Sequence, residues 1–166
     1  YAGQVLKLPG GADAPAPAPE NHPGGDASNV VDAARALKGD GYHYTVNLTS
    51  NYNPVRFKIG CCADFAIDSW AKAGKDLYHE ISNPHYVPTI MNWMKDHGEF
   101  AHTAKPGDMV FFDWDGDGEG DHVAIVTEVD GNGHASKIIE SYDFNQPVRE
   151  RSIGNSSDNI MGYAHP

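Results

Sequence analysis

The sequence predicts an α+β domain in which helical segments come first and an antiparallel sheet follows. Before residue 98, apolar residues recur at helical spacing in three segments. After Pro106 the pattern changes to short apolar and β-branched runs, separated by turns rich in Gly, Asp and Asn. Helices grouped ahead of strands, rather than alternating with them, are typical of the α+β class.

Length and charge narrow the class of protein. The 166 residues allow one full domain whose core needs no disulfide or metal to hold it together. A net charge of −11 disfavours nucleic acid as a partner and favours the binding of cations. No apolar run has the length of a membrane span, so we expect no membrane partner. We also expect no nucleic-acid partner, and a monomer.

The first 25 residues are expected to lie outside the folded domain. Residues 1–9, YAGQVLKLP, resemble the last strand of a LysM carbohydrate-binding module. Residues 10–25 are rich in Pro, Ala and Gly and are expected to form an extended linker. We therefore expect a catalytic domain at 26–166. The start at Tyr1, without a signal-peptide pattern, suggests a fragment or a processed product.

Three helices are expected ahead of the sheet. They begin near Ser28, at Cys62 and at Thr89, and each carries apolar residues three or four positions apart. Glycines at 39, 74 and 98 follow them and are natural helix ends. Residues Asp40–Ile59 are rich in Tyr, Asn and Thr and are expected to form a loop.

The chain has two cysteines, and they are adjacent. Neighbouring cysteines such as Cys61 and Cys62 rarely form a disulfide, because a trans peptide holds their Cα atoms closer than a disulfide prefers. Cys61 is expected to be a small buried residue. Cys62 is expected at or near the start of the second helix, where the positive end of the helix dipole favours a thiolate.

The strands are expected to carry two further groups that suit thiol chemistry. Strands are predicted at 109–114, 123–129, 137–142, 148–152 and 160–163. His122 opens the second of these strands and Glu140 lies in the third, so antiparallel pairing can bring them together. A nucleophilic thiol needs a base, and the base needs a third group that fixes its tautomer. Tyr142 or a backbone carbonyl is the alternative to Glu140 as this third group.

An acidic loop separates the first two strands. Every second residue from 113 to 117 is Asp and Gly118 follows, which matches the first half of an EF-hand calcium loop. Crowded carboxylates repel one another unless a cation neutralises them. Position 12 of the loop is Ala124, so the bidentate Glu of an EF-hand is missing. We expect a β-hairpin that binds Ca²⁺, with a solvated acidic turn as the alternative. The expected ligands are Asp113, Asp115, Asp117 and Asp121, with the Glu119 carbonyl.

Three segments, GCCADFAIDSWAKAG, PGDMVFF and DHVAIVTEV, resemble the papain-like peptidoglycan hydrolases of the NlpC/P60, CHAP and related amidase families. The resemblance covers Asp26–Pro166 and implies a papain-like fold. It implies Cys62 as the nucleophile, His122 as the base and Glu140 as the orienting group of CHAP enzymes. Tyr142 departs from the Asn usual in CHAP enzymes, and the acidic insertion is not general to these families.

The same resemblance implies a cysteine-dependent peptidoglycan hydrolase, either an N-acetylmuramoyl-L-alanine amidase or an endopeptidase. Backbone N–H groups at the helix start, including that of Cys62, would then hold the oxyanion. The LysM-like tail and the linker suggest a modular lysin (an endolysin), secreted or phage-delivered, that acts at the bacterial cell wall. Two other classes stay open: a calcium-dependent binding or adhesion module without catalysis, and a cysteine peptidase that acts on protein.

Overall fold

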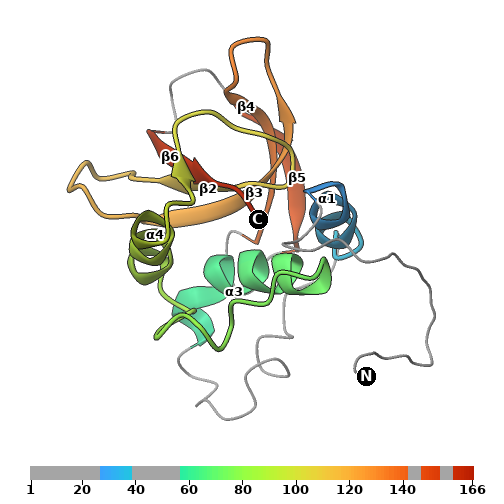
Figure 1. Cartoon of the computed structure of the whole chain (residues 1–166). Coiled ribbons are helices and arrows are strands. Elements are labelled where there is room, and N and C mark those ends of the chain that lie inside the picture. The colour runs from blue at the N-terminus through green and yellow to red at the C-terminus, as the bar shows by residue number, and fades with distance from the viewer. Residues whose placement is uncertain (1–26, 39–56, 142–146, 154–158) are drawn as a thin grey trace, which may run out of the picture.

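The computed structural model describes residues 27–38, 57–141, 147–153 and 159–166, and only the backbone at 27–28 and 57–61. In these residues three helices precede a six-stranded sheet, so the predicted α+β class is confirmed (Figure 1). The LysM-like tail, the linker and most of the expected loop at 40–59 lie outside the described residues. The helices are α1 (Ala27–Arg35), α3 (Phe57–Lys72) and α4 (Val87–Asp96). The strands are β1 (Phe100–Ala101), β2 (Met109–Phe112), β3 (His122–Val129), β4 (Ala135–Glu140), β5 (Arg149–Ser152) and β6 (Ile160–Ala164).

The sheet has the order β1-β6-β2-β3-β4-β5, and every pair of neighbouring strands is antiparallel. All five predicted strands are present. The two-residue strand β1 was not predicted, because so short a segment carries no alternation. β2 and β3 form a hairpin around the acidic loop, which confirms the predicted hairpin and places His122 at the first position of β3.

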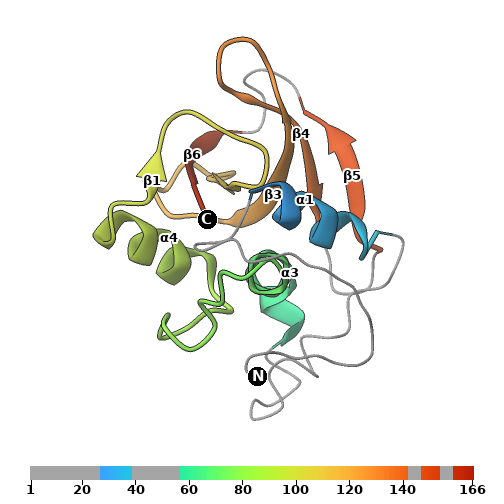
Figure 2. The same cartoon turned by 45° about the vertical axis from the view of Figure 1, so that its right-hand side comes forward.

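The helices gather on one side of the sheet, with α3 between α1 and α4 (Figures 1 and 2). α3 contacts β3 and buries Phe65, Ala66 and Trp70 in the core, as its apolar spacing predicts. None of the helices in the described part of the chain combines the length and apolarity needed to cross a membrane.

The central strands are buried on both faces. Met109 and Phe111 of β2 belong to the core beneath the helices, whereas Val110 and Phe112 belong to a second apolar cluster. Burial on both faces explains why β2 and the start of β3 are continuous apolar runs, without the alternation of a half-exposed strand. The second cluster consists of Ala104, Val110, Phe112, Ala124, Val126, Ala135, Ile138 and Tyr163.

The expectation that Cys62 opens its helix is wrong. α3 begins at Phe57, so Cys62 is its sixth residue and lies in the second turn. The helix runs through Gly60, because tertiary packing overrides the modest helix penalty of a glycine. Only the first four N–H groups of a helix lack an intrahelical partner, and the dipole acts mainly in the first turn. Neither the dipole nor the Cys62 N–H therefore has the role that the sequence suggested.

The turn Pro106-Gly-Asp leads into β2 and is held against α3 by a hydrogen bond. The indole of the buried Trp70 donates a hydrogen bond of 3.0 Å to the Gly107 carbonyl. Gly107 has φ +97°, a conformation that favours glycine, and its N–H donates to the Val126 carbonyl at 2.8 Å. Asp108 accepts the Lys105 N–H at 2.7 Å and contacts His165. These contacts fix where β2 enters the sheet beside β3.

Gly162 allows β1 to approach β6 closely. A Cβ at this position would lie 2.4 Å from the Phe100 ring and 3.0 Å from the Ala101 carbonyl oxygen. We therefore expect Gly162→Ala to lower the free energy of unfolding by about 1–3 kcal/mol, as overpacking does. Urea denaturation measures this change. Gly131→Ala is the matched control, since its Cβ would meet nothing within 4 Å. Equal stability of the two variants would contradict this packing.

Candidate active site

Strand pairing brings His122 and Glu140 together. Ile125 pairs with Ile139, so Glu140 lies opposite Ala124, diagonally across from His122 on the same face. The distance from His122 Nε2 to Glu140 Oε1 is 2.9 Å, and both side chains are almost fully buried. The structure thus places beside His122 the carboxylate expected there. Tyr142, the alternative, lies outside the described residues.

Two arginines of β5 hold the other oxygen of Glu140. Arg149 Nε and Arg151 Nε lie 3.0 Å and 2.6 Å from Glu140 Oε2. Burial alone raises the pKa of this carboxyl, but the hydrogen bonds from His122 and Arg151 outweigh it and lower the pKa to about 2. Glu140 is therefore ionised at neutral pH, and it accepts a hydrogen bond from the His122 ring.

His122 also contacts the thiol of Cys62. Burial by itself lowers the pKa of His122, but hydrogen bonds with Cys62 and Glu140 raise it to about 9. Since Nε2 is bound to Glu140, Nδ1 is the ring nitrogen left for the thiol. The three predicted groups therefore form a chain from sulfur to imidazole to carboxylate. With a pKa of about 9 the ring is cationic at neutral pH, which places a positive charge beside the sulfur.

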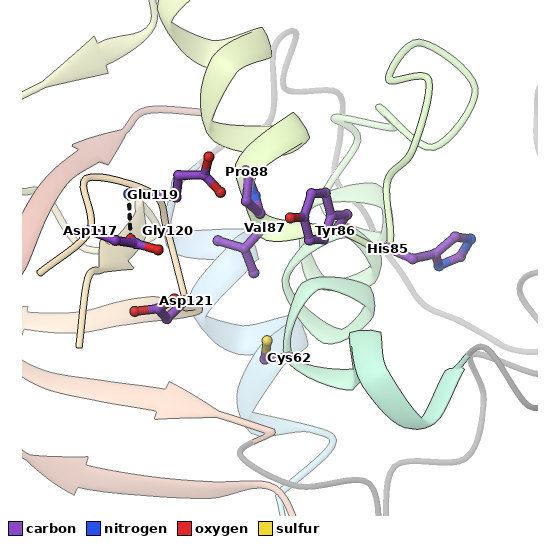
Figure 3. Close-up of a pocket in the computed structure, with 9 residues that line it drawn as sticks. All are labelled: Cys62, His85, Tyr86, Val87, Pro88, Asp117, Glu119, Gly120 and Asp121. Carbon is purple, nitrogen blue, oxygen red and sulfur yellow. Dashed lines mark hydrogen bonds between the residues drawn. The ribbon is translucent and has the colours of Figure 1, made fainter. Parts of the chain in front are cut away.

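Cys62 opens onto a pocket of about 250 Å³. Its thiol forms no disulfide, and its side chain points from α3 towards Val87 at the start of α4 (Figure 3). The other walls come from the acidic loop and from the segment that leads into α4, so three elements enclose the space next to the sulfur. The lining residues are Cys62, His85, Tyr86, Val87, Pro88, Asp117, Glu119, Gly120 and Asp121.

The acidic loop folds around the carboxylate of Asp113. This group accepts the N–H groups of Gly116 and Gly118, each at 2.8 Å, and both glycines have positive φ. Asp121 closes the loop, because its Oδ2 accepts the Trp114 N–H at 2.7 Å. The loop is thus a structured turn whose last residue directly precedes His122.

Four aspartates of this loop can hold a cation. Carboxylate oxygens of Asp113, Asp115, Asp117 and Asp121 all lie within 4.8 Å of one another. Backbone hydrogen bonds, first that of Gly118, lower the pKa of Asp113. The pKa of Asp115 is raised: a backbone hydrogen bond from Asp117 lowers it, but desolvation and the carboxylates of Asp117 and Asp121 have the larger effect. Such crowded oxygens fit a hard cation such as Ca²⁺.

Trp114 was not predicted to belong to the site. Its indole stacks on the His122 imidazole, with ring centroids 4.8 Å apart and an interplanar angle of 19°. It is one of two exposed large apolar side chains among the described residues, and the other, Tyr86, lines the pocket. The sequence pattern indicated only that Trp114 ends a strand, and nothing in it points to the stack.

Sequence reasoning also missed the groups that support the site. Arg149 and Arg151 alternate on one strand and so share a face, a signal that becomes visible only once β5 is known to pair with β4. Asp64, buried two residues after the cysteine, contacts His85 Nδ1. Burial raises the pKa of Asp64 despite this contact. The pair ties α3 to the pocket wall across a turn, and no sequence pattern marks it.

The fold is that of a papain-like α+β domain of the NlpC/P60 type. The structure is similar to the NlpC/P60 domain of the peptidoglycan hydrolase SagA, with a TM-score of 0.52 and 16% identity over 85% of this chain and 99% of that one. It is also similar to an NlpC/P60 family protein from Bacillus cereus ATCC 10987, with a TM-score of 0.56 and 16% identity over 86% of this chain. The match covers 41% of the Bacillus protein. At such identity these similarities show the shared fold.

The chain belongs to the CHAP family. The CHAP domain model matches residues 50–142, more than half of the 166 residues. The match includes Cys62, His122 and Glu140, and it confirms the family resemblance inferred from the sequence. No curated protein matches the chain.

The pairing of Glu140 predicts how stability depends on pH. Its folded pKa of about 2 lies below the ordinary 4.5, so its stabilisation is complete above pH 4.5 and is lost as the pH falls towards 2. We expect Glu140→Gln to lower the free energy of unfolding by about 3 kcal/mol at pH 7. The difference from the wild type should shrink steadily below pH 4.5, as followed by urea denaturation.

Glu128→Gln is the control for this experiment. Glu128 forms an ion pair of 3.3 Å with Lys137, and its side chain is 54% exposed. Its loss should cost less than about 1 kcal/mol at any pH. A Glu140→Gln penalty that stays constant from pH 7 to the lowest pH at which both proteins remain folded would contradict the pairing.

Proposed function

We propose that this protein is a peptidoglycan hydrolase that cleaves an amide bond with Cys62, His122 and Glu140. The observation that carries the proposal is the thiol–imidazole–carboxylate chain beside a pocket. Membership of the CHAP family and the fold shared with a peptidoglycan hydrolase support the wall as substrate. A binding or adhesion module would need neither the buried base nor its charge partners.

In the proposed reaction, Cys62 Sγ attacks the carbonyl carbon of the amide with its proton already on His122. The His122 Nδ1–H then passes this proton to the leaving nitrogen as the C–N bond breaks, which leaves a thioester on Cys62. His122 next takes a proton from water, whose oxygen attacks the thioester. Collapse of the second intermediate releases a carboxylic acid and returns the thiol and imidazole to their starting states.

Glu140 would fix the tautomer and the direction of the base. An ionised carboxylate accepts hydrogen bonds only, so His122 Nε2 must carry the proton and Nδ1 must face the thiol. His122 and Arg151 keep the pKa of this carboxyl low inside the protein, and Arg149 forms a further ion pair with it. The two arginines would act through Glu140, so they are positioning residues.

The bond that is cut can be identified by digesting purified peptidoglycan and analysing the products by mass spectrometry. An N-acetylmuramoyl-L-alanine amidase would release stem peptides from intact glycan strands, whereas an endopeptidase would leave shortened peptides on them. Either product supports the proposal. New reducing ends without new amines, or cleavage of casein with no action on the wall, would overturn it.

We infer a modular lysin from the first 25 residues. The linker 10–25 would tether the catalytic domain to a wall-binding module, of which residues 1–9 resemble the last strand, and this would raise the local concentration of the enzyme at the wall. The enzyme would act outside the cytosol, after secretion or phage delivery. A chain that carries a complete wall-binding module should sediment with purified walls more than residues 26–166 do. Equal sedimentation would contradict the tethering.

The cysteines provide the sharpest test of the mechanism. We expect Cys62→Ser to lower wall lysis at least about a thousandfold, because a serine hydroxyl is a far weaker nucleophile in this setting. Cys61→Ser is the matched control, with the same change one position earlier, and should keep most of the activity. Turbidity of a wall suspension measures both variants. Equal losses would show that Cys62 is not the nucleophile.

We further propose that the acidic loop binds Ca²⁺. Oxygens of Asp113, Asp115, Asp117 and Asp121 would be ligands, with the Glu119 carbonyl as a fifth. The fit rests on the closeness of these oxygens and on the unfavourable crowding of charge at Asp115. The ion would order the loop next to His122, which makes its effect on the reaction one of positioning.

Calcium removal tests this site. Without the bidentate Glu of an EF-hand, we expect a Kd of roughly 10⁻⁵ to 10⁻³ M by isothermal titration calorimetry. Chelation should lower both the activity and the melting temperature reversibly, and Asp115→Ala should abolish the calorimetric signal. Glu80→Ala, at an exposed acid outside the loop, should bind as the wild type does. Unchanged rate and melting temperature after chelation would leave the loop a solvated turn.

A further inference from the structure

Trp114 combines exposure with a contact that the proposed reaction depends on. Its side chain is 41% exposed, whereas the imidazole on which it stacks is 2% exposed. The indole of Trp114 is therefore only partly buried, and it covers the imidazole of His122, the proposed base. A single exposed apolar side chain is ordinary, so the stack on His122 is the feature that distinguishes Trp114.

The hydrogen bond to Glu140 cannot by itself fix the orientation of His122. It holds one atom, Nε2, and leaves the imidazole free to pivot about the line of that bond. Such a pivot would move Nδ1 away from Cys62. Fixing the plane of the ring requires contact on its face, and a near-parallel ring at 19° provides this contact.

Phe112 adds a second aromatic contact, and the three rings form one cluster. Phe112 is the cross-strand partner of His122, with centroids 5.6 Å apart and an angle of 32°. The ring centroids of Trp114 and Phe112 are 6.2 Å apart. Phe112 is fully buried and belongs to the second core, so Trp114 alone of the two aromatic neighbours can be changed without opening that core.

The backbone of Trp114 is anchored independently of its side chain. Its N–H donates a hydrogen bond of 2.7 Å to Asp121 Oδ2, and Asp121 directly precedes His122. This hydrogen bond therefore fixes the backbone from which the indole extends, and also the residue directly before His122. Removal of the indole should leave this backbone hydrogen bond in place.

We propose that Trp114 is a positioning residue, whose indole holds the His122 imidazole in the plane from which Nδ1 faces Cys62. This inference rests on the proposed roles of Cys62 and His122. It adds the group that fixes the plane of the base to the group, Glu140, that fixes its tautomer. A residue of this kind affects the chemical step and leaves the binding of substrate largely unchanged.

The test compares Trp114→Leu and Trp114→Phe with the control Trp93→Leu. Trp93 stacks on His97 with centroids 3.8 Å apart and an angle of 16°, so the control removes a similar stack from α4. We expect Trp114→Leu to lower kcat on purified walls roughly ten- to hundredfold with little change in apparent KM, as misplacement of a catalytic group does. Trp114→Phe keeps an aromatic face and should restore most of the rate, and Trp93→Leu should keep it.

A second measurement needs no wall. In a Cys61→Ser background, the rate of Cys62 alkylation by iodoacetamide reports on the contact between thiol and imidazole. Trp114→Leu should slow this reaction, and Trp114→Phe should not. If the wild type fails to lyse walls while the alkylation pattern holds, the proposed function is wrong and the role of Trp114 stands. A wild-type kcat in Trp114→Leu, a change in KM alone, or an equal loss in Trp93→Leu would overturn that role.

Discussion

The rest of the site depends on the buried charge of Glu140. An ionised carboxylate without solvent is costly unless cations surround it, and here His122, Arg149 and Arg151 do so from two neighbouring strands. A shift of one residue in either strand would turn these groups to the other face of the sheet and leave the charge alone. The same interaction therefore helps to specify the register of β3, β4 and β5 and, together with Cys62, raises the pKa of His122.

The hairpin between β2 and β3 connects the acidic loop directly to His122. Its acidic residues end at Asp121, and its aromatic residues Phe112 and Trp114 lie against His122. His122, the proposed base, is the first residue of the second strand. The acidic loop and the His122 side chain thus belong to one hairpin. An ion bound in the loop and an indole stacked on the base would both act on the position of the same imidazole.

Much of the architecture could be predicted because it follows from local patterns. Helical spacing located α1 and α4, and apolar runs between turn residues located β2, β3, β4 and β6. The start of α3 was misplaced by five residues, since Gly60 suggested a boundary that packing overrode. His122 and Glu140 were found because each lies at the end of a strand, next to a change of pattern that is visible in the sequence.

By itself, the sequence determined the α+β class, the nucleophile candidate, the base candidate and the acidic loop. Each of these can be recognised within a short segment, either from its periodicity or from a motif. Only the tertiary structure decided which groups surround Glu140, that Asp64 contacts His85, and that Trp114 covers His122. The arginine and His85 contacts join residues 9 to 21 positions apart, and the indole contact depends on how the acidic loop closes. Strand pairing, helix packing and loop closure bring these side chains together, and no local pattern encodes their distances.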